Sequence, residues 1–288
     1  MQQDQRHGRR TGLAVSLRDF AAWEALQQVL HDISTARQAL AGSQPEQSGG
    51  PEVSGSAASG PSTPGAHAGA SSLRVIDIGG GTGGLAVAIA ELGHSVTVVD
   101  PNPDALAALT RRAADAGVAG RVDAVQGDTE TLAQLHPEAD VDLVCCHGVL
   151  EYVDDPYTSL QSIAGVLAPG GYLSLVVAQR MAAVLGRALA GQFEQARQAL
   201  VSPDARWGSA DPLPRRFDAI GIGDLVRSAG LVVDDSHGIR VFSDLVPSTH
   251  LDSEADRAAL LELEREASRQ GEVLGQLGAA VHLLARRD

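Results

Sequence analysis

A glycine-rich stretch between residues 75 and 84 has the residue types and spacing most suited to ligand chemistry. It reads Val-Ile-Asp-Ile-Gly-Gly-Gly-Thr-Gly-Gly, an apolar run typical of a buried strand followed by a turn with Gly79, Gly80, Gly81 and Gly83. Because glycine has no side chain, such a turn lets the backbone approach a nucleotide-like ligand closely. The spacing fits both G-x-G-x-x-G and G-x-G-x-G, so the glycines alone fit either a nicotinamide dinucleotide or S-adenosylmethionine.

Two acids near this turn distinguish between those cofactors. Asp77 lies within the strand end directly before the glycines, where it would repel a pyrophosphate but could neutralise the ammonium of S-adenosylmethionine, directly or through a relay. Asp100 ends the next apolar run, residues 96–99, where a carboxylate can hold both ribose hydroxyls. The competing interpretations are a structural acid for Asp77 and a helix-capping acid for Asp100. We predict S-adenosylmethionine as the cofactor.

The elements that must position these residues alternate between strand and helix from residue 73 onward, which predicts a parallel sheet covered by helices on both faces. The predicted strands are residues 73–78, 95–100, 122–126, 141–146, 172–178, 231–234 and 280–285, with residues 240–242 extending the sheet edge. Residues 180–216 interrupt the alternation with two short helical patterns and a Pro-rich loop. We expect them to form a small helical cap above the strand ends, where ligands bind in such sheets.

The chain before the sheet has two parts of different composition. Residues 17–40 have apolar side chains at helical spacing, with Ser16 and Asp19 resembling a capping box. Residues 41–72 are rich in Gly, Ser, Pro and Ala, and cannot bury enough apolar surface to order themselves. We therefore predict an N-terminal helical segment over residues 1–40 that contributes to the cofactor site, a flexible insert over 41–72, and an α/β domain over 73–288.

Composition limits the other function classes. Of 288 residues, 44% are hydrophobic, and 22 basic against 36 acidic side chains give a net charge of −14, which disfavours broad, unspecific nucleic-acid binding. Cys145 and Cys146 are adjacent in an apolar strand, so we expect a reduced, buried pair facing opposite ways. The histidines show no metal-ligand spacing, and no apolar run is long enough to span a bilayer. A cytoplasmic protein without a metal site is the prediction.

Taken together, these motifs resemble the class I S-adenosylmethionine-dependent methyltransferases. The motifs are the glycine turn, Asp100, residues 127–129 (Gly-Asp-Thr), residues 147–152 (His-Gly-Val-Leu-Glu-Tyr) and residues 169–171 (Pro-Gly-Gly). A narrower resemblance is to the bacterial tRNA 5-carboxymethoxyuridine methyltransferases, which esterify the carboxylate of the wobble uridine. It rests on the motif at 147–152 together with Arg18 and residues 171–175, 238–242 and 260–264. The resemblance implies a Rossmann-like fold with a seven-stranded, mostly parallel sheet. This chain departs from the family pattern in the insert at 41–72 and in lacking the family's lysine-rich stretch. These departures weaken the inference of a tRNA substrate more than the inference of a methyltransferase.

The resemblance also implies roles for individual residues. Arg18 and His147 match the family's cofactor-contacting Arg and His, while Asp128 and Thr129 would lie beside the adenine. Arg240 is the candidate for binding the acceptor carboxylate. Each has a plainer interpretation: a solvated Arg, a structural His, or ordinary turn chemistry for the Asp-Thr pair. A carboxylate is already ionised at neutral pH, so we expect no residue acting as a general base.

Charge distribution gives the first indication of the methyl acceptor. Residues 1–18 and 180–216 each have a local charge of +3, from four Arg against one acid and from six Arg against three acids. A modest basic face on an acidic protein suits one arm of a tRNA, although Arg-rich surface helices have the same composition. We predict tRNA as the partner. The alternatives are a small-molecule methyltransferase and a protein that binds S-adenosylmethionine without transferring its methyl group, and salt dependence of methyl transfer would separate tRNA from a small molecule.

Overall fold

A seven-stranded sheet forms the centre of the computed structural model, which describes residues 20–136, 138–270 and 272–288 apart from residues 43–71. The strand order is β3-β2-β1-β4-β5-β7-β6, and β7 alone runs antiparallel to its neighbours. The strands are β1 (Arg74–Ile78), β2 (Ser95–Asp100), β3 (Val122–Gln126), β4 (Val141–His147), β5 (Leu167–Ala178), β6 (Leu231–Ile239) and β7 (Ala280–Arg287). This confirms the predicted Rossmann-like, mostly parallel sheet.

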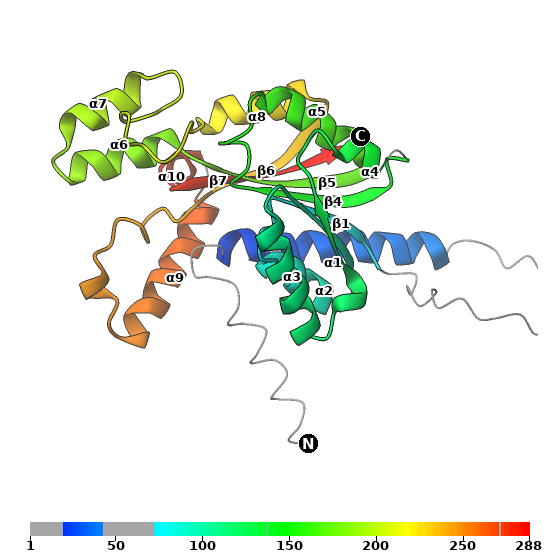
Figure 1. Ribbon diagram of the computed structural model, residues 1–288. Coiled ribbons are helices and arrows are strands. Elements are labelled where there is room, and N and C mark those ends of the chain that lie inside the picture. The colour runs from blue at the N-terminus through cyan, green and yellow to red at the C-terminus, as the bar shows by residue number, and fades with distance from the viewer. Residues whose placement is uncertain (1–19, 43–71, 137, 271) are drawn as a thin grey trace, which may run out of the picture.

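Helices cover both faces of this sheet (Figure 1). One face carries α1 (Phe20–Gly42), α2 (Gly84–Glu91) and α3 (Pro103–Asp115), and the other carries α4 (Leu132–Leu135), α5 (Pro156–Val166) and α8 (Ala219–Ser228). Two separate apolar clusters result, one on each side of the sheet. The adjacent thiols divide between them as predicted, because Cys145 packs in the α1-side cluster and Cys146 in the α5-side cluster.

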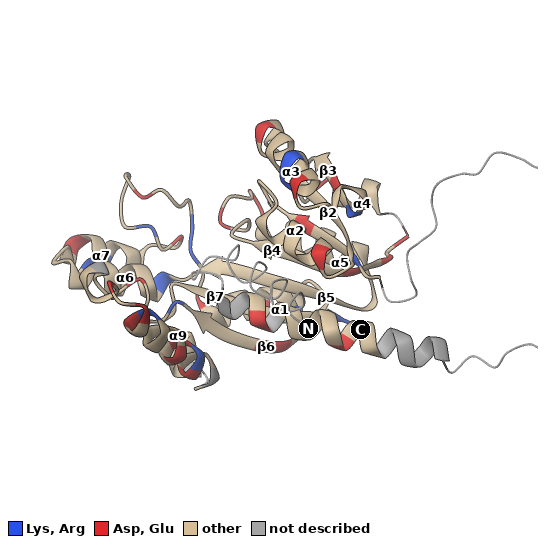
Figure 2. Cartoon of the chain, turned by 90° about the horizontal axis from the view of Figure 1, so that it is seen from below, with Lys and Arg blue, Asp and Glu red and all other residues tan. Residues whose placement is uncertain are grey.

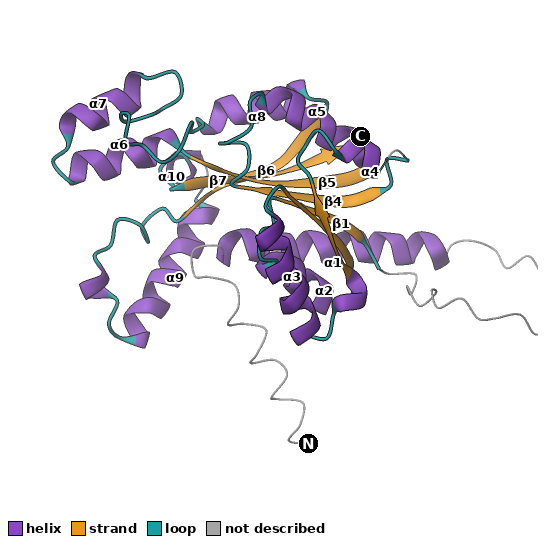
Figure 3. Cartoon of the chain, viewed as in Figure 1, coloured by secondary structure: helices purple, strands orange, loops and turns teal. Residues whose placement is uncertain are grey.

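The remaining short and peripheral elements complete the architecture. They are α6 (Arg180–Leu189), α7 (Phe193–Val201), α9 (Glu254–Arg269), α10 (Glu272–Gly275) and the 3₁₀ helices η2 (Ala119–Arg121) and η3 (Ser248–His250). Helix α1 runs along its face of the sheet, and α9 lies against both α1 and β6 (Figures 1 and 2). A long loop separates α7 from α8, and another separates β6 from α9 (Figure 3).

Two helices begin with ordinary capping chemistry. Asn102 caps α3 through its side-chain oxygen, which accepts from the backbone N–H groups of Asp104 and Ala105 at 3.0 and 3.4 Å. Asp155 caps α5 in the same way, and a proline occupies the first turn of each helix. Proline fits there because its missing N–H has no partner in a first turn. These caps set where each chain segment turns back from the strand ends.

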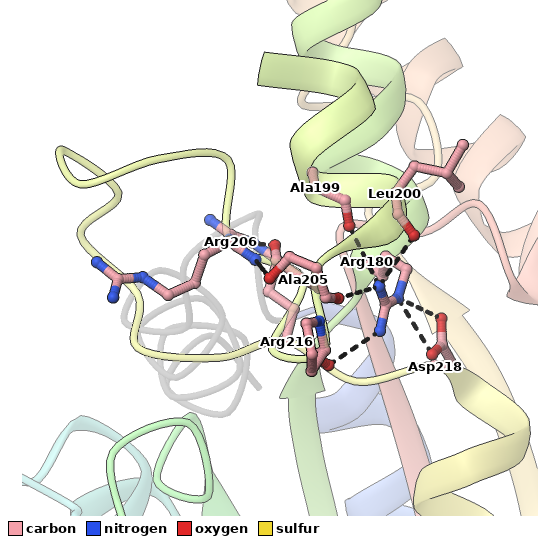
Figure 4. Close-up of polar contacts among 9 residues, drawn as sticks. Arg180, Ala199, Leu200, Ala205, Arg206, Arg216 and Asp218 are labelled. Carbon is pink, nitrogen blue, oxygen red and sulfur yellow. Dashed lines mark hydrogen bonds and ion pairs between the residues drawn. The ribbon is translucent and has the colours of Figure 1, made fainter. Parts of the chain in front are cut away.

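The predicted helical cap consists of α6 and α7, and Arg180 joins the end of α7 to Asp218 at the start of α8 (Figure 4). Its Nε donates to both carboxylate oxygens of Asp218 at 3.0 and 3.2 Å. Its terminal nitrogens donate to the carbonyls of residues 199, 200, 202 and 203, at and beyond the end of α7. A planar guanidinium can satisfy several orphan carbonyls at once, so Arg180 fixes the end of α7 over the strand edge.

Two expectations about the chain path were wrong or incomplete. Residues 240–242 do not extend the sheet, because β6 continues to Ile239 and Arg240 then turns the chain with φ of 55°. The Glu264 carboxylate accepts from the backbone N–H groups of residues 241, 242 and 243, which replaces ladder pairing. The short helices α4 and α10 were not predicted. The capping box at Ser16–Asp19 and nearly all of the insert at 41–72 lie outside the described residues.

Candidate functional site

The glycine turn after β1 forms the base of the candidate cofactor site. Gly79, Gly81 and Gly83 have φ values of 67°, 53° and 77°, in the left-handed region that favours glycine. The N–H of Gly79 donates to the carbonyl of Val99 at 2.8 Å, which ties the turn to the end of β2. A Cβ at Gly83 would lie 2.0 Å from Cδ1 of Leu109 on α3. The turn is therefore fixed in shape by its backbone and by the helix beside it.

Asp77 lies beneath this turn rather than in open solvent. Its side chain is buried, and Oδ2 has no hydrogen-bond partner among the described residues. A Cβ at Gly80 would lie 2.4 Å from that oxygen, so only glycine leaves room for the carboxylate. Burial, with a smaller contribution from the Asp100 charge, raises the pKa of Asp77 to about 7. A buried carboxylate oxygen without a partner is costly, which indicates that a cationic or donor group belongs near Oδ2.

Asp100 at the end of β2 is held in place by two backbone amides. Its Oδ2 accepts from the N–H of Gly81 at 2.9 Å, and its Oδ1 accepts from the N–H of Asn102 at 2.8 Å. Each carboxylate oxygen has a second lone pair, so both can still accept from a diol. The side chain lines a cavity, and its binding of ribose stays a prediction.

That cavity has a volume of about 710 Å³ and opens at the carboxyl ends of β1, β2, β3 and β4. It brings together Gly79, Asp100, Asp128 and Thr129 of the predicted cofactor residues. Gly148, Val149, Tyr152, Val153, Ser159 and Ser162 complete its more apolar side. A flat heterocycle and a ribose fit a space of this size and mixed polarity.

The Asp128–Thr129 pair combines turn chemistry with a place on the cavity wall. Oδ1 of Asp128 accepts from the N–H of Glu130 at 2.9 Å and of Thr131 at 3.3 Å, an Asx turn. Thr129 is buried, and its hydroxyl lies 3.0 Å from that of Ser159. The plainer interpretation thus holds for Oδ1 of Asp128, while contact of this exposed residue with adenine stays a prediction.

Six predicted cofactor residues do not line this cavity or lie outside the described residues, namely Arg18, Asp77, Gly80, Gly81, Gly83 and His147. His147 ends β4 on the α1 side of the sheet, partly buried, with Nε2 2.9 Å from Oγ of Ser174. Burial lowers its pKa to about 4, so the ring is neutral at physiological pH. Asp77 does not line the cavity either. Arg18 falls outside the described residues, and its role stays a prediction.

Arg240 belongs to a second cavity, of about 440 Å³, between the helical cap and the ends of β5, β6 and β7. Gln179, Arg187, Trp207, Arg216 and Asp244 also line it. The Nε of Arg240 is buried without a hydrogen-bond partner and lies 3.5 Å from Oδ2 of Asp244. A non-glycine residue at positive φ stores backbone strain, which is typical of functional positions. Arg240 is therefore a cation at the wall of this cavity whose charge faces Asp244.

Two buried side chains at the same strand edge were missed as site residues. Oε1 of Glu151 accepts from the N–H of Ala178 at 2.7 Å, while its buried Oε2 has no partner among the described residues. Gln179 donates to the carbonyls of Gly275, Gly278 and Ala280 at 2.7 to 3.2 Å. Glu151 belongs to the motif 147–152 and could have been singled out there. Nothing in the sequence near Gln179 indicates its role in holding α10 to the sheet.

The chemistry of these residues fits S-adenosylmethionine. The unpartnered Oδ2 of Asp77 suits an ammonium group, and the amide-anchored Asp100 suits the two ribose hydroxyls. A pyrophosphate would not fit here, because its negative charge would be repelled by the ionised carboxylates of Asp77 and Asp100. Within the described ranges, no group of three or more His, Cys, Asp or Glu side chains could hold a metal ion. No helix there has the length and apolarity to cross a membrane.

Comparison with known proteins agrees with this geometry. Residues 76–175 match the methyltransferase domain family. The chain is 33% identical over 222 residues to the tRNA 5-carboxymethoxyuridine methyltransferase of Escherichia coli K12, covering 77% of this chain and 83% of that protein. It is 36% identical over 118 residues to a ubiquinone biosynthesis O-methyltransferase of Pectobacterium carotovorum, covering 39% and 48%. A SAM-dependent methyltransferase from Methanosarcina mazei shares the fold, with a TM-score of 0.50, 18% identity and coverage of 75% and 92%.

Proposed function

This chain belongs to the tRNA 5-carboxymethoxyuridine methyltransferase family of class I S-adenosylmethionine-dependent methyltransferases, and we propose that it esterifies the carboxylate of 5-carboxymethoxyuridine at the tRNA wobble position. The observation that carries the proposal is the length of the match to the tRNA enzyme. Similarity over 222 residues extends well beyond the methyltransferase domain at 76–175, whereas the O-methyltransferase match covers only 118 residues. Acceptor specificity depends on segments outside the shared cofactor half.

The proposed reaction requires the enzyme to orient the two substrates and does not require a general acid or base. When bound, S-adenosylmethionine supplies an electrophilic methyl group on a sulfonium. The acceptor carboxylate is ionised at neutral pH and needs no proton removed. The protein must hold the carboxylate in line with the methyl group and exclude water, which positioning alone can achieve.

Arg240 is the residue we propose for holding that carboxylate. It lies at the carboxyl edge of the sheet, in the cavity under the helical cap. The Glu264 carboxylate anchors the turn that follows it, through three backbone N–H groups at 2.7 to 3.0 Å. Asp244, 3.5 Å away, balances the Arg240 charge until an anionic ligand replaces it. A guanidinium can bind a carboxylate through two parallel hydrogen bonds.

Three of the six arginines in residues 180–216 form ion pairs with described carboxylates. Arg180 pairs with Asp218, Arg197 with Glu194, and Arg216 with Asp211. The basic face predicted from the sequence is therefore smaller than its six arginines suggest (Figure 2).

Three cap arginines have no carboxylate partner within the described residues, namely Arg187, Arg206 and Arg215. Arg187 stacks over Trp207, 3.8 Å from the ring centroid, at the wall of the Arg240 cavity. We propose these three arginines as the phosphate contacts. A small footprint of this kind suits one tRNA arm rather than a long duplex.

The test is methyl transfer to tRNA lacking the wobble ester, measured at several salt concentrations with two variants. We expect Arg240→Lys to lower the rate at least tenfold, because a lysine cannot reproduce the two parallel hydrogen bonds. Arg227→Lys is the matched control, since Asp224, on the exposed side of α8, is the one ion-pair partner of Arg227 within the part of the chain that the structure describes. Transfer to tRNA should also fall steeply with salt. An Arg240→Lys rate equal to the control would overturn the role of Arg240, salt-independent transfer would overturn the phosphate contacts, and no transfer to the tRNA would favour a small-molecule acceptor.

A further inference from the structure

A row of hydrogen-bonding side chains crosses the sheet from β4 to β6 on the side covered by α1. Nε2 of His147 lies 2.9 Å from Oγ of Ser174, which lies 2.9 Å from Nε2 of His282. Nδ1 of His282 is 3.3 Å from Nε2 of His237, whose Nδ1 is 3.4 Å from Oδ2 of Asp235. The row begins at His147, at the carboxyl end of the central strand β4. It ends at the outermost strand β6, where the Asp235 side chain is 62% exposed.

The interior of this row can contain only neutral imidazoles. Ser174 and His282 are completely buried. Burial, with a smaller effect of the neighbouring His237, holds the pKa of His282 well below its usual range, and burial lowers that of His147 to about 4. A neutral imidazole has one N–H and one lone pair, so each ring must donate on one side and accept on the other. Every hydrogen bond in the row therefore fixes the direction of the next one.

The exposed carboxylate selects between the two possible directions. The hydrogen bond from His237 keeps the pKa of Asp235 below its usual range, so this group accepts and cannot donate. When the His237 ring is neutral, its Nδ1 must then carry the proton that faces Asp235, and its Nε2 accepts from Nδ1–H of His282. Ser174 donates to the lone pair on Nε2 of His282 and accepts from Nε2–H of His147. The opposite direction would place a ring lone pair against the Asp235 carboxylate.

We propose that Asp235 is a positioning residue, which through His237, His282 and Ser174 holds His147 as the Nε2–H tautomer with an acceptor lone pair on Nδ1. No described residue bonds to that Nδ1. At the cofactor edge, a lone pair suits a donor such as the ammonium group of S-adenosylmethionine, whereas an N–H would oppose it. This last step rests on the predicted contact between His147 and the cofactor, which is part of the function proposed above.

The direct test is the tautomer of His147, read from ring ¹⁵N shifts at pH 8, where an ordinary imidazole is neutral. The wild type should show the Nε2–H form. Asp235→Asn should give a mixture or the Nδ1–H form, because an amide can donate as well as accept. Asp234→Asn is the matched control, with the same change of charge on a neighbour that pairs with Arg286 instead. A wild-type Nδ1–H form, or an unchanged tautomer in Asp235→Asn, would overturn the proposal.

A second variant and a binding measurement separate the parts of the proposal. Ser174→Ala cuts the row in the middle, so adding Asp235→Asn to it should leave the His147 spectrum unchanged. Binding of S-adenosylhomocysteine should weaken by about threefold to tenfold in Asp235→Asn and stay constant in Asp234→Asn. A changed tautomer with constant affinity would overturn the role toward the cofactor. None of these readouts involves tRNA, so a failed tRNA assay would count against the proposed acceptor and leave this inference standing.

Discussion

Replacing the buried Asp77 carboxylate by an amide should make the cofactor-free protein more stable at neutral and alkaline pH. Asp77 is 2% exposed, and its Oδ2 has no partner among the described residues. Its pKa rises from 3.8 to about 7, chiefly because burial disfavours the charge. At 1.36 kcal/mol per pKa unit, that difference corresponds to an upper limit of about 4 kcal/mol for ionising Asp77 in the folded protein.

The sign of the pH dependence follows from the raised pKa. Between pH 3.8 and about 7 the folded state keeps the Asp77 proton that the unfolded state has lost. The folded state therefore binds more protons, and the free energy of unfolding falls as pH rises through this window. Above about pH 7 both states are ionised and the loss is complete. Relative to Asp77→Asn, the wild type should lose about 2.5 kcal/mol between pH 5 and pH 8.

Urea unfolding of both proteins at pH 5, 6, 7 and 8 without cofactor measures this difference. Comparing the two proteins removes the contribution of the other titrating groups. S-adenosylhomocysteine should reduce the loss of stability between pH 5 and pH 8, because its ammonium group near Asp77 stabilises the ionised carboxylate. Asp77→Asn should bind S-adenosylhomocysteine about 10 to 100 times more weakly than the wild type. If the two stability curves run parallel from pH 5 to pH 8, Asp77 is not the strained acid inferred here.

Other perturbations test the turn, the core and the acceptor side. Gly83→Ala should destabilise the protein by about 2–4 kcal/mol in urea unfolding, because φ is 77° and the new methyl would meet Leu109; an unchanged midpoint would contradict this. Cys145 and Cys146 should stay unreactive to Ellman's reagent in the native protein and both react after unfolding, since burial raises the pKa of each thiol; rapid native labelling would refute the buried pair. Glu264→Gln should raise the KM for the acceptor while cofactor affinity stays constant, because it loosens the turn after β6; equal changes in both would point to general unfolding.

Much of the fold follows from local signals in the sequence. Apolar runs of strand length predicted all seven strands, and helical spacing predicted α1 and the two helices of the cap. The path after Ile239 could not be predicted, because it depends on a carboxylate 25 residues later in the chain. The short helices α4 and α10 have four residues each, too few for a helical period to be recognised.

In the candidate site too, some features could be predicted from neighbouring residues in the sequence, and others depend on contacts between distant segments. Gly79 and Asp100 follow strands whose ends meet at one sheet edge, so their proximity could be inferred from the order of elements. The ion pairs within the helical cap could not, since which arginines remain available depends on tertiary contacts. The row from His147 to Asp235 joins residues 88 positions apart and depends on β5 and β7 lying between β4 and β6. Histidines scattered along the sequence gave no sign of it.

The most direct test of the central claim is the transfer of labelled methyl from S-adenosylmethionine to tRNA lacking the wobble ester, followed by mild alkali. A methyl ester is hydrolysed under these conditions, whereas a methyl group on a base carbon, a ring nitrogen or a ribose oxygen is retained. We expect label to enter the tRNA and to be released by alkali. Alkali-stable label, or no label from a protein proven to bind the cofactor, would contradict esterification of the wobble carboxylate.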